Sequence, residues 1–151
     1  MTDAETLAFL EAGHTLQVAT IGKNGFPHVA PMWFVVDGGR IVFRSFTKSQ
    51  KIVNLARNQK LTVLVEDGLD YAELRGVMIQ GAAQLIADRD YVLEIYRRLS
   101  AKYAMVAGER RELDAETLEA TWGRYAEKNT AVVVEPAKIV TWDHTKLAGG
   151  Y

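Results

Sequence analysis

Residues 15–45, TLQVATIGKNGFPHVAPMWFVVDGGRIVFRS, decide the fold because they hold three apolar, strand-like runs separated by two turn signals. The first turn is Asn24-Gly25, a dipeptide whose tolerance of positive φ favours a tight β-hairpin. The second is Asp37-Gly38-Gly39. Short strand-like runs joined by such turns predict a three-stranded antiparallel meander with strands at 15–21, 26–36 and 40–45.

The rest of the chain contains further helical and strand-like segments. Asp3 is a plausible N-cap for a short helix that stops at Gly13. The other expected elements are a helix at 49–58, strands at 60–67 and 71–86, a helix at 88–107, a helical segment at 115–128 and a strand at 130–143. Gly76 and Gly81 predict either bulges or a sharply coiled barrel strand, and Pro136 predicts a bend or an edge position in the last strand.

Antiparallel hairpins with helices set apart from the strands indicate an α+β protein built around a small barrel. Alternating βαβ units and a G-x-G-x-x-G motif are both missing from the sequence, so a Rossmann nicotinamide site is not expected. A length of 151 residues fits one domain, 1–151, with one core.

The composition excludes several classes of function. The 18 basic and 19 acidic side chains nearly balance, which argues against a general nucleic-acid binder. The chain has no cysteine, and His14, His28 and His144 lack metal-ligand spacing, so we expect no metal site. The acidic N-terminus is unlike a signal peptide, and no apolar run reaches the roughly 20 residues that a membrane span needs. We therefore expect a soluble, cytoplasmic protein.

A basic, hydroxyl-rich junction between a strand and a helix lies at residues 43–58, FRSFTKSQKIVNLARN. Unpaired N–H groups at a helix start, with hydroxyls before them and cations nearby, are suited to binding a phosphate. The ordinary alternative is that a hydroxyl only caps the helix and that the charged residues form its solvated face. The candidate residues are Arg44, Ser45, Thr47, Ser49, Lys51, Asn54 and Arg57.

The strand before this junction carries Pro31, Met32, Trp33 and Phe34 in succession. Bulky apolar side chains beside a phosphate cradle are what a flat tricyclic ring would stack on. Core packing is the alternative interpretation for alternate positions of the same strand.

Taken in order, the motifs G-x-P-x-x-x-P-x-W-F, D-G-G and S-x-K-x-x-N-L-x-R resemble the pyridoxamine 5′-phosphate oxidase-like split-barrel superfamily. The resemblance is to its short oxidoreductases that use FMN or the deazaflavin F420, and it covers about residues 15–86 with a weaker match at the last strand. It implies a six-stranded split β-barrel homodimer with two cofactor sites at the subunit interface.

The resemblance also implies roles for individual residues. Ser49 and Lys51 fall at the family's phosphate-binding S-x-K, and Asn54 and Arg57 match its N-L-x-R. Further residues implied are Arg44, Ser45 and Thr47 beside the phosphate, and Met32, Trp33 and Phe34 along the ring. A common F420-binding variant has arginine in place of Ser49, so the choice between FMN and F420 stays open.

Two features concern the substrate and the partner chain. The vitamin-oxidising members carry an R-x-H-D-R-like C-terminal motif, whereas this chain ends TWDHTKLAGGY, so we do not expect pyridoxine phosphate oxidation. If the C-terminal segment crosses the dimer interface, the residues that would reach the partner's site are Arg75, Trp142, His144 and Tyr151.

The expected function is a flavin- or F420-dependent oxidoreductase that transfers a hydride between the cofactor and a small unsaturated or quinone-like substrate. The cofactor carries the chemistry, so no catalytic acid or base is assigned. The alternative is a carrier of flavin, F420 or haem without turnover, since one fold hosts both roles. An RNA-binding barrel is disfavoured by the charge balance.

Overall fold

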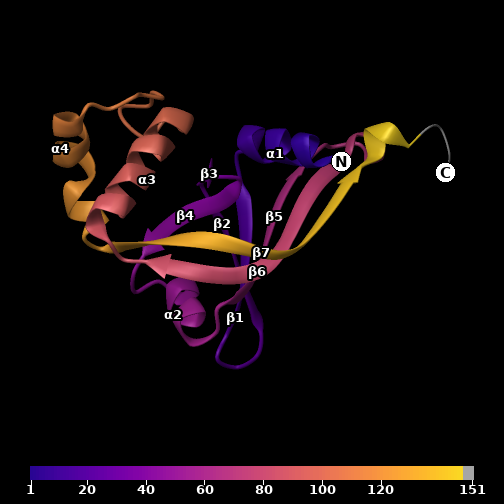
Figure 1. Ribbon diagram of the computed structural model, residues 1–151, viewed down its shortest axis with the longest axis horizontal. Helices are drawn as coiled ribbons and strands as arrows, with labels where there is room; N and C mark the ends of the chain where they lie inside the picture. The colour runs from indigo at the N-terminus through magenta and orange to yellow at the C-terminus, as the bar shows by residue number, and fades with distance from the viewer. Residues whose placement is uncertain (148–151) are drawn as a thin grey trace.

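One antiparallel sheet of seven strands forms the centre of the computed structural model, which describes residues 1–147. The strands are β1 (Leu16–Ile21), β2 (Pro27–Met32), β3 (Phe34–Asp37), β4 (Arg40–Phe46), β5 (Lys60–Asp67), β6 (Arg75–Ile86) and β7 (Asn129–Asp143). The helices are α1 (Asp3–Ala12), α2 (Gln50–Arg57), α3 (Arg89–Lys102) and α4 (Ala115–Ala126), with short 3-10 turns η1 (Tyr71–Glu73) and η2 (His144–Lys146). The predicted α+β class, an antiparallel sheet with flanking helices, is confirmed (Figure 1).

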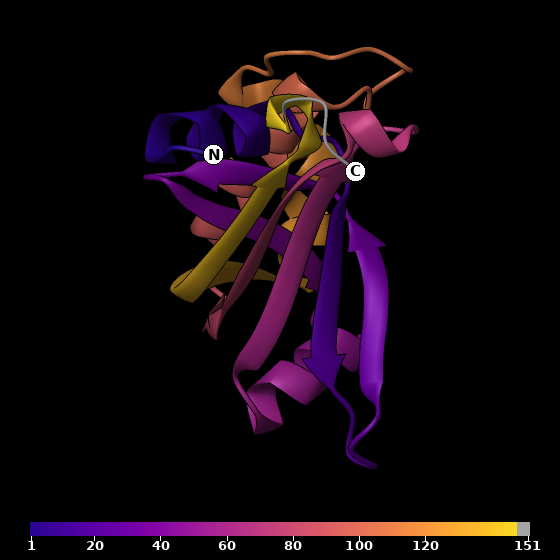
Figure 2. The ribbon, with the colours of Figure 1, turned by 90° about the vertical axis from the view of Figure 1, so that its right-hand side faces the viewer.

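The strand order β2-β1-β5-β6-β7-β4-β3 puts β2 and β3 at opposite edges of the sheet, although Trp33 alone separates them in the chain. The sheet must therefore curl until its two edges meet at Trp33, which gives the half-open barrel seen in Figure 2. The prediction of one strand across 26–36, and with it a three-stranded meander and six strands in all, is wrong. This segment forms two separate strands, β2 and β3, which are the two edge strands of one sheet.

Tyr103 supplies the hydrogen bonds that the strand loses at this break. Its hydroxyl oxygen accepts from the Phe34 N–H at 3.3 Å and lies 3.1 Å from the Phe34 carbonyl and 2.9 Å from the His14 carbonyl. The Tyr103 ring also stacks on the indole of Trp33, with centroids 4.9 Å apart and planes at 14°. Buried backbone groups need hydrogen-bond partners. The Tyr103 side chain therefore stabilises the crossover between the two sheet edges.

Two hydrophobic clusters use the two faces of β4 and β7. Phe43 and Val132 point into the barrel, where Leu16, Phe34 and Leu55 join them. Val42 and Val133 point outward and pack under α3 and α4. Because successive strand residues face opposite ways, burial on both faces explains the unbroken apolar run at the start of β7.

Helix α2 closes the lower end of the barrel in Figure 1. Its Ile52 and Leu55 are buried in the barrel cluster, as the helical spacing predicted. The β1–β2 hairpin projects beyond this helix in Figure 2, and its Gly25 adopts φ 83°, the conformation for which Asn-Gly turns are suited. The predicted hairpin is confirmed by the pairing of Ile21 with Pro27.

Several predicted boundaries move. Thr2, and not Asp3, caps α1, because its hydroxyl accepts from the Glu5 N–H at 3.2 Å while the Glu5 carboxylate accepts from the Thr2 N–H at 2.7 Å. The expected strand at 71–86 begins with η1 and becomes regular only at Arg75. Helix α3 ends at Lys102 instead of residue 107, because Tyr103 turns to an extended conformation to reach Phe34.

A bulge lies opposite Gly81, but its extra residue is in β7, and at Gly76, where a second bulge was predicted, the strand pairing is regular. Gln80 pairs with Lys138 but Gly81 pairs with Pro136, so Ala137 is an extra residue in β7. A Cβ on Gly81 would lie 2.1 Å from the Glu135 carbonyl oxygen, which explains the need for glycine there. Pro136 lies at this bulge and beyond the part of β7 that pairs with β4, which ends at Val133, in agreement with the predicted bend or edge position.

Candidate functional site

The start of α2 brings together Ser45, Ser49 and Lys51, as the sequence predicted for a phosphate seat. Ser45 lies near the end of β4 with its side chain on the barrel face, and its Oγ is 3.0 Å from Ser49 Oγ and 3.3 Å from Lys51 Nζ. Ser49 is the N-cap residue of α2, yet its side chain makes no capping hydrogen bond. Two hydroxyls and an ammonium thus converge beside helix N–H groups that lack intrahelical acceptors.

Lys51 is placed to receive an anion. Burial lowers the pKa of its ammonium group, because the charged form loses hydration there. Its hydrogen bond goes to the neutral Ser45 hydroxyl, and none of the ion pairs formed within residues 1–147 includes it. An added phosphate would restore the electrostatic stabilisation that burial removes from this cation.

Asn54, Arg57 and Thr47 lie around this cluster but are engaged within the chain. Asn54 is fully buried, donates to Thr20 Oγ1 at 3.0 Å and accepts from Gln50 Nε2 at 2.8 Å. Arg57 donates to the Ile21 carbonyl and to Asn54 Oδ1. The hydroxyls of Thr47 and Thr130 are 2.9 Å apart, with either as donor. These contacts hold α2 against β1 and the loop before α2 against β7, and thereby fix the position of Lys51.

The side chain of Arg44 points to the opposite face of β4 from that of its neighbour Ser45. Its guanidinium carbon lies 4.4 Å from the centroid of the Tyr96 ring on α3, on the outward face of β4. Its Nε is buried without a hydrogen-bond partner in the described part of the chain, and burial lowers its pKa. Adjacent strand residues point to opposite faces, so the structure does not bring this guanidinium into the Ser45–Lys51 cluster.

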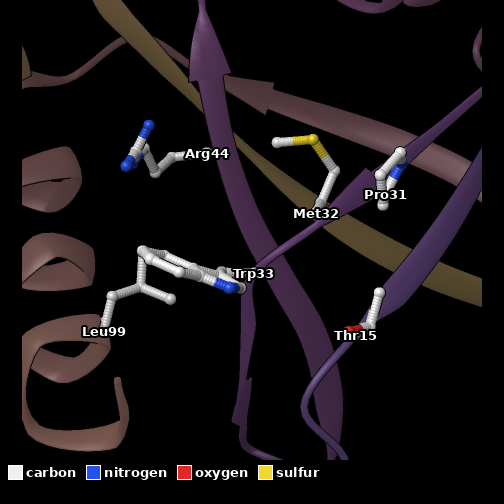
Figure 3. A pocket seen from close by; sticks show the side chains of 6 residues that line it. All are labelled: Thr15, Pro31, Met32, Trp33, Arg44 and Leu99. Atoms are coloured by element: carbon white, nitrogen blue, oxygen red, sulfur yellow. The ribbon is translucent and has the colours of Figure 1, made fainter. Parts of the chain in front are cut away.

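A cavity of about 320 Å³ lies on this outward side of the crossover. Figure 3 shows Arg44 and Met32 on the same side of the Trp33 indole, with Thr15 on the other. The residues lining it are Thr15, Pro31, Met32, Trp33, Arg44 and Leu99. Arg44 is the charged residue among these six, and the remainder offer mostly apolar surface.

The three predicted ring contacts differ in what they expose. Trp33 is 47% exposed and Met32 is partly buried, so both offer side-chain surface at the cavity. Phe34 is fully buried in the barrel, and its N–H and carbonyl both face the Tyr103 hydroxyl. Its side chain therefore supports the site from behind.

The residues predicted to reach a partner chain lie at the opposite end of β6 and β7. Arg75 forms an ion pair with Asp67 at 2.8 Å. Trp142 lies flat over Gly76, where a Cβ would come 2.1 Å from the indole ring. His144 Nδ1 is 2.8 Å from the Tyr71 carbonyl oxygen. Tyr151 lies outside the described residues, and contact of this group with a partner stays a prediction.

Sequence reasoning missed the contribution of α3. Tyr96 supports Arg44, Leu99 lines the cavity, and Tyr103 holds the crossover. The sequence places Tyr91, Ile95, Leu99 and Tyr103 at four-residue intervals, which indicates an apolar helix face but not the strands that this face covers. Lys102 was also missed; its Nζ is buried without a hydrogen-bond partner among residues 1–147, 4.0 Å from the Phe34 ring centroid.

Residues 1–147 contain no group of three or more histidine, aspartate or glutamate side chains positioned to hold a metal ion. No helix in this part of the chain is both long and apolar enough to cross a membrane.

Comparison with known structures identifies the class of fold. A conserved hypothetical protein from Mycobacterium tuberculosis is 30% identical, with a TM-score of 0.86, over 100% of this chain and 90% of that one. A structure described as an F420 reductase is 25% identical, with a TM-score of 0.66, over 88% of this chain and 94% of that one.

The family model described as pyridoxamine 5′-phosphate oxidase matches residues 2–143, and the chain belongs to this family. The resemblance seen in the sequence is thereby confirmed. A 5a,11a-dehydrotetracycline/5a,11a-dehydrooxytetracycline reductase from Streptomyces rimosus is 33% identical in an 86-residue alignment that covers 53% of this chain. The match spans 61% of the length of that reductase.

Proposed function

We propose that this protein is an oxidoreductase that binds FMN or F420 and passes a hydride between the cofactor ring and a small unsaturated or quinone-like substrate. The observation that carries this proposal is the convergence of Ser45, Ser49 and Lys51 at the start of α2. Ser49 Oγ and Lys51 Nζ lie 3.0 and 3.3 Å from Ser45 Oγ, and the three groups have no acidic partner within the described residues. Both cofactors carry a phosphate group that such a donor set fits.

The ring end of the cofactor is proposed to lie along the crossover between β2 and β3. Met32 and Trp33 offer apolar surface there, and aromatic surfaces favour stacking with a flat ring. Phe34 and Tyr103 hold this segment in place from the barrel side. Asn54, Arg57 and Thr47 act as positioning residues, because they fix α2 relative to the strands.

A homodimer is proposed because β2 is incompletely covered by its own chain. It has no buried residue, its Val29 is 59% exposed, and it stands at an edge of the sheet beside the half-exposed Trp33. Exposed apolar edge strands are normally covered by another element or another chain. A second copy placed there would enclose the cofactor and supply further contacts, for which Arg75 and Trp142 remain candidates.

The cofactor, when bound, supplies the two-electron redox chemistry. This chain's residues bind its phosphate, orient its ring and limit water around it. The similarity to a dehydrotetracycline reductase from Streptomyces rimosus and to an F420 reductase supports this proposal.

A turnover assay separates an enzyme from a carrier. Reduced cofactor is mixed with 2-methyl-1,4-naphthoquinone, and its reoxidation is followed with and without the protein. The proposal expects faster reoxidation with the protein and a rate that saturates with quinone concentration. Tight binding of the cofactor with equal reoxidation rates would instead support a carrier.

A further inference from the structure

Arg44 is a cation without a charged or hydrogen-bonding partner in the described part of the chain. Its guanidinium makes no hydrogen bond or ion pair within residues 1–147, and its Nε is buried. A buried cation without an anion is costly, because the lost hydration is not replaced. Buried atoms of His28, Lys102 and Asn129 also lack a hydrogen-bond partner among residues 1–147, but Arg44 is the one of these four residues that lines the cavity.

The guanidinium is held in a fixed position. The Tyr96 ring below it is 1% exposed and stacks on Trp122, with centroids 4.8 Å apart and planes at 19°. A packed aromatic platform restricts the rotamers of the arginine, so little entropy is lost when a ligand binds. This is the arrangement expected of a binding residue and not of a solvated surface arginine.

The cavity beside Arg44 indicates the shape of the ligand. It measures about 320 Å³, which suits a group of one or two fused rings. Trp33, Met32 and Leu99 give it apolar walls, and the indole of Trp33 offers a flat surface (Figure 3). A guanidinium presents paired, coplanar donors that match the two oxygens of a carboxylate or an ionised enol. A planar organic anion satisfies both requirements.

This site is separate from the phosphate seat. Arg44 and Ser45 are consecutive residues of β4, and their side chains point to opposite faces of the sheet. One phosphate therefore cannot contact both side chains. Lys51 already serves the Ser45 side. The guanidinium is therefore free for a second ligand that meets the cofactor at the crossover residues Met32 and Trp33.

We infer that Arg44 anchors a second binding site, between β4, the β2–β3 crossover and α3, that takes a planar organic anion bearing a carboxylate or an ionised enol. That this anion is the substrate rests on the proposed function. The binding site itself rests on Arg44, its aromatic support and the cavity.

Two matched naphthoquinones test the inference. At neutral pH 2-hydroxy-1,4-naphthoquinone is an anion, whereas 2-methyl-1,4-naphthoquinone is neutral and nearly the same size. Binding of each is measured by calorimetry to the full chain, both as purified and saturated with FMN or F420. The wild type is expected to prefer the anion by about tenfold or more, the effect of a charge-assisted hydrogen bond.

Variants assign the preference to Arg44. Arg44→Gln should abolish it and leave the neutral quinone's affinity unchanged, and Arg44→Lys should retain part of it because the charge remains without the planar fork. Arg124→Gln, which removes an exposed arginine on α4, should change neither affinity. Arg44→Lys also gives a readout if Arg44→Gln fails to fold, which circular dichroism checks.

The failures of the two proposals are distinguishable. A wild type that binds both quinones equally, or a preference that survives Arg44→Gln, overturns the anion site whatever the cofactor does. The anion site would also be overturned if Arg44→Gln weakened FMN or F420 binding as much as Lys51→Ala does. Arg44 would then bind the cofactor. An Arg44-dependent preference in a protein that binds neither cofactor would uphold the site and reject the oxidoreductase.

Discussion

Arg44 and Ser45 are neighbours in sequence, yet they face opposite sides of β4. The guanidinium carbon of Arg44 lies 4.4 Å from the centroid of the Tyr96 ring, while Ser45 Oγ lies 3.0 Å from Ser49 Oγ at the start of α2. The alternation of side chains along a strand divides one basic stretch of sequence into two places. One is suited to a phosphate, and the other to a planar anion beside Trp33.

Asn54 is expected to hold α2 in place. Asn54→Ala removes a fully buried side chain and leaves Thr20 and Gln50 without their partner. We expect the free energy of unfolding to fall by about 1–3 kcal/mol, the cost of leaving buried polar groups unpaired. Urea denaturation measures it, and the exposed Gln59→Ala is the matched control. A loss no greater than that of the control would show that the network does not position the helix.

Lys102 is expected to make stability depend on pH. Burial lowers its pKa from 10.5 to about 8 in the folded protein. Between these two values the unfolded chain binds the additional proton, so the free energy of unfolding should rise as the pH is raised from 8 towards 10.5. The full shift corresponds to roughly 3 kcal/mol, and screening of this partly exposed side chain reduces it to about 1–2 kcal/mol.

Lys102→Met tests this dependence. The variant should be more stable than the wild type at pH 7 by about 1–2 kcal/mol, and its advantage should shrink as the pH approaches 10. Denaturation curves at several pH values measure both effects, with the exposed Lys138→Met as control. A constant difference between variant and wild type across this range would refute the assignment to Lys102.

Gly76 and Trp142 form a tight cross-strand contact. A Cβ at position 76 would lie 2.1 Å from the indole, so Gly76→Ala should displace Trp142 and lower the free energy of unfolding by about 1–3 kcal/mol. The double variant Gly76→Ala/Trp142→Ala removes the clash, and its loss of stability should be smaller than the sum of the two single losses. Strictly additive losses would show that the two residues do not interact.

The exposed edge strand β2 is expected to be covered in a homodimer. Val29→Glu places a charge on a side chain that is 59% exposed in the single chain, so it should shift the protein towards the monomer without unfolding it. Sedimentation velocity measures the change, and the exposed Glu116→Gln on α4 provides a control outside this edge. A wild type that remains monomeric at high micromolar concentration would reject the dimer.

The sequence predicted local features well where neighbouring residues determine them. Asn24-Gly25 identified the β1–β2 hairpin, and the spacing of Ile52 and Leu55 identified α2. Ser49 and Lys51 both contact the Ser45 hydroxyl, which lies only four and six positions earlier in the chain. Each of these depends on contacts within a few residues.

Features that depend on distant residues were not predictable. The strand at 26–36 reads as continuous because nothing nearby shows that Tyr103, about seventy positions later, will bind the backbone at Phe34. In the same way, the sequence places Arg44 in one phosphate site with Lys51, because nothing nearby shows that the Arg44 side of β4 packs under Tyr96. The order of strands in the sheet, set by long-range pairing, decided both outcomes.

The central claim, that Lys51 and the adjacent hydroxyls seat a cofactor phosphate, is tested most directly by titrating the wild type and Lys51→Ala with FMN and with F420 and following cofactor fluorescence. We predict that the wild type binds at least one of them and that Lys51→Ala weakens this binding by about 1.5–3 kcal/mol, which is roughly ten- to hundredfold. The exposed Lys138→Ala should have no effect. Wild-type protein that binds neither cofactor below millimolar concentration, or equal affinities for wild type and Lys51→Ala, would contradict the claim.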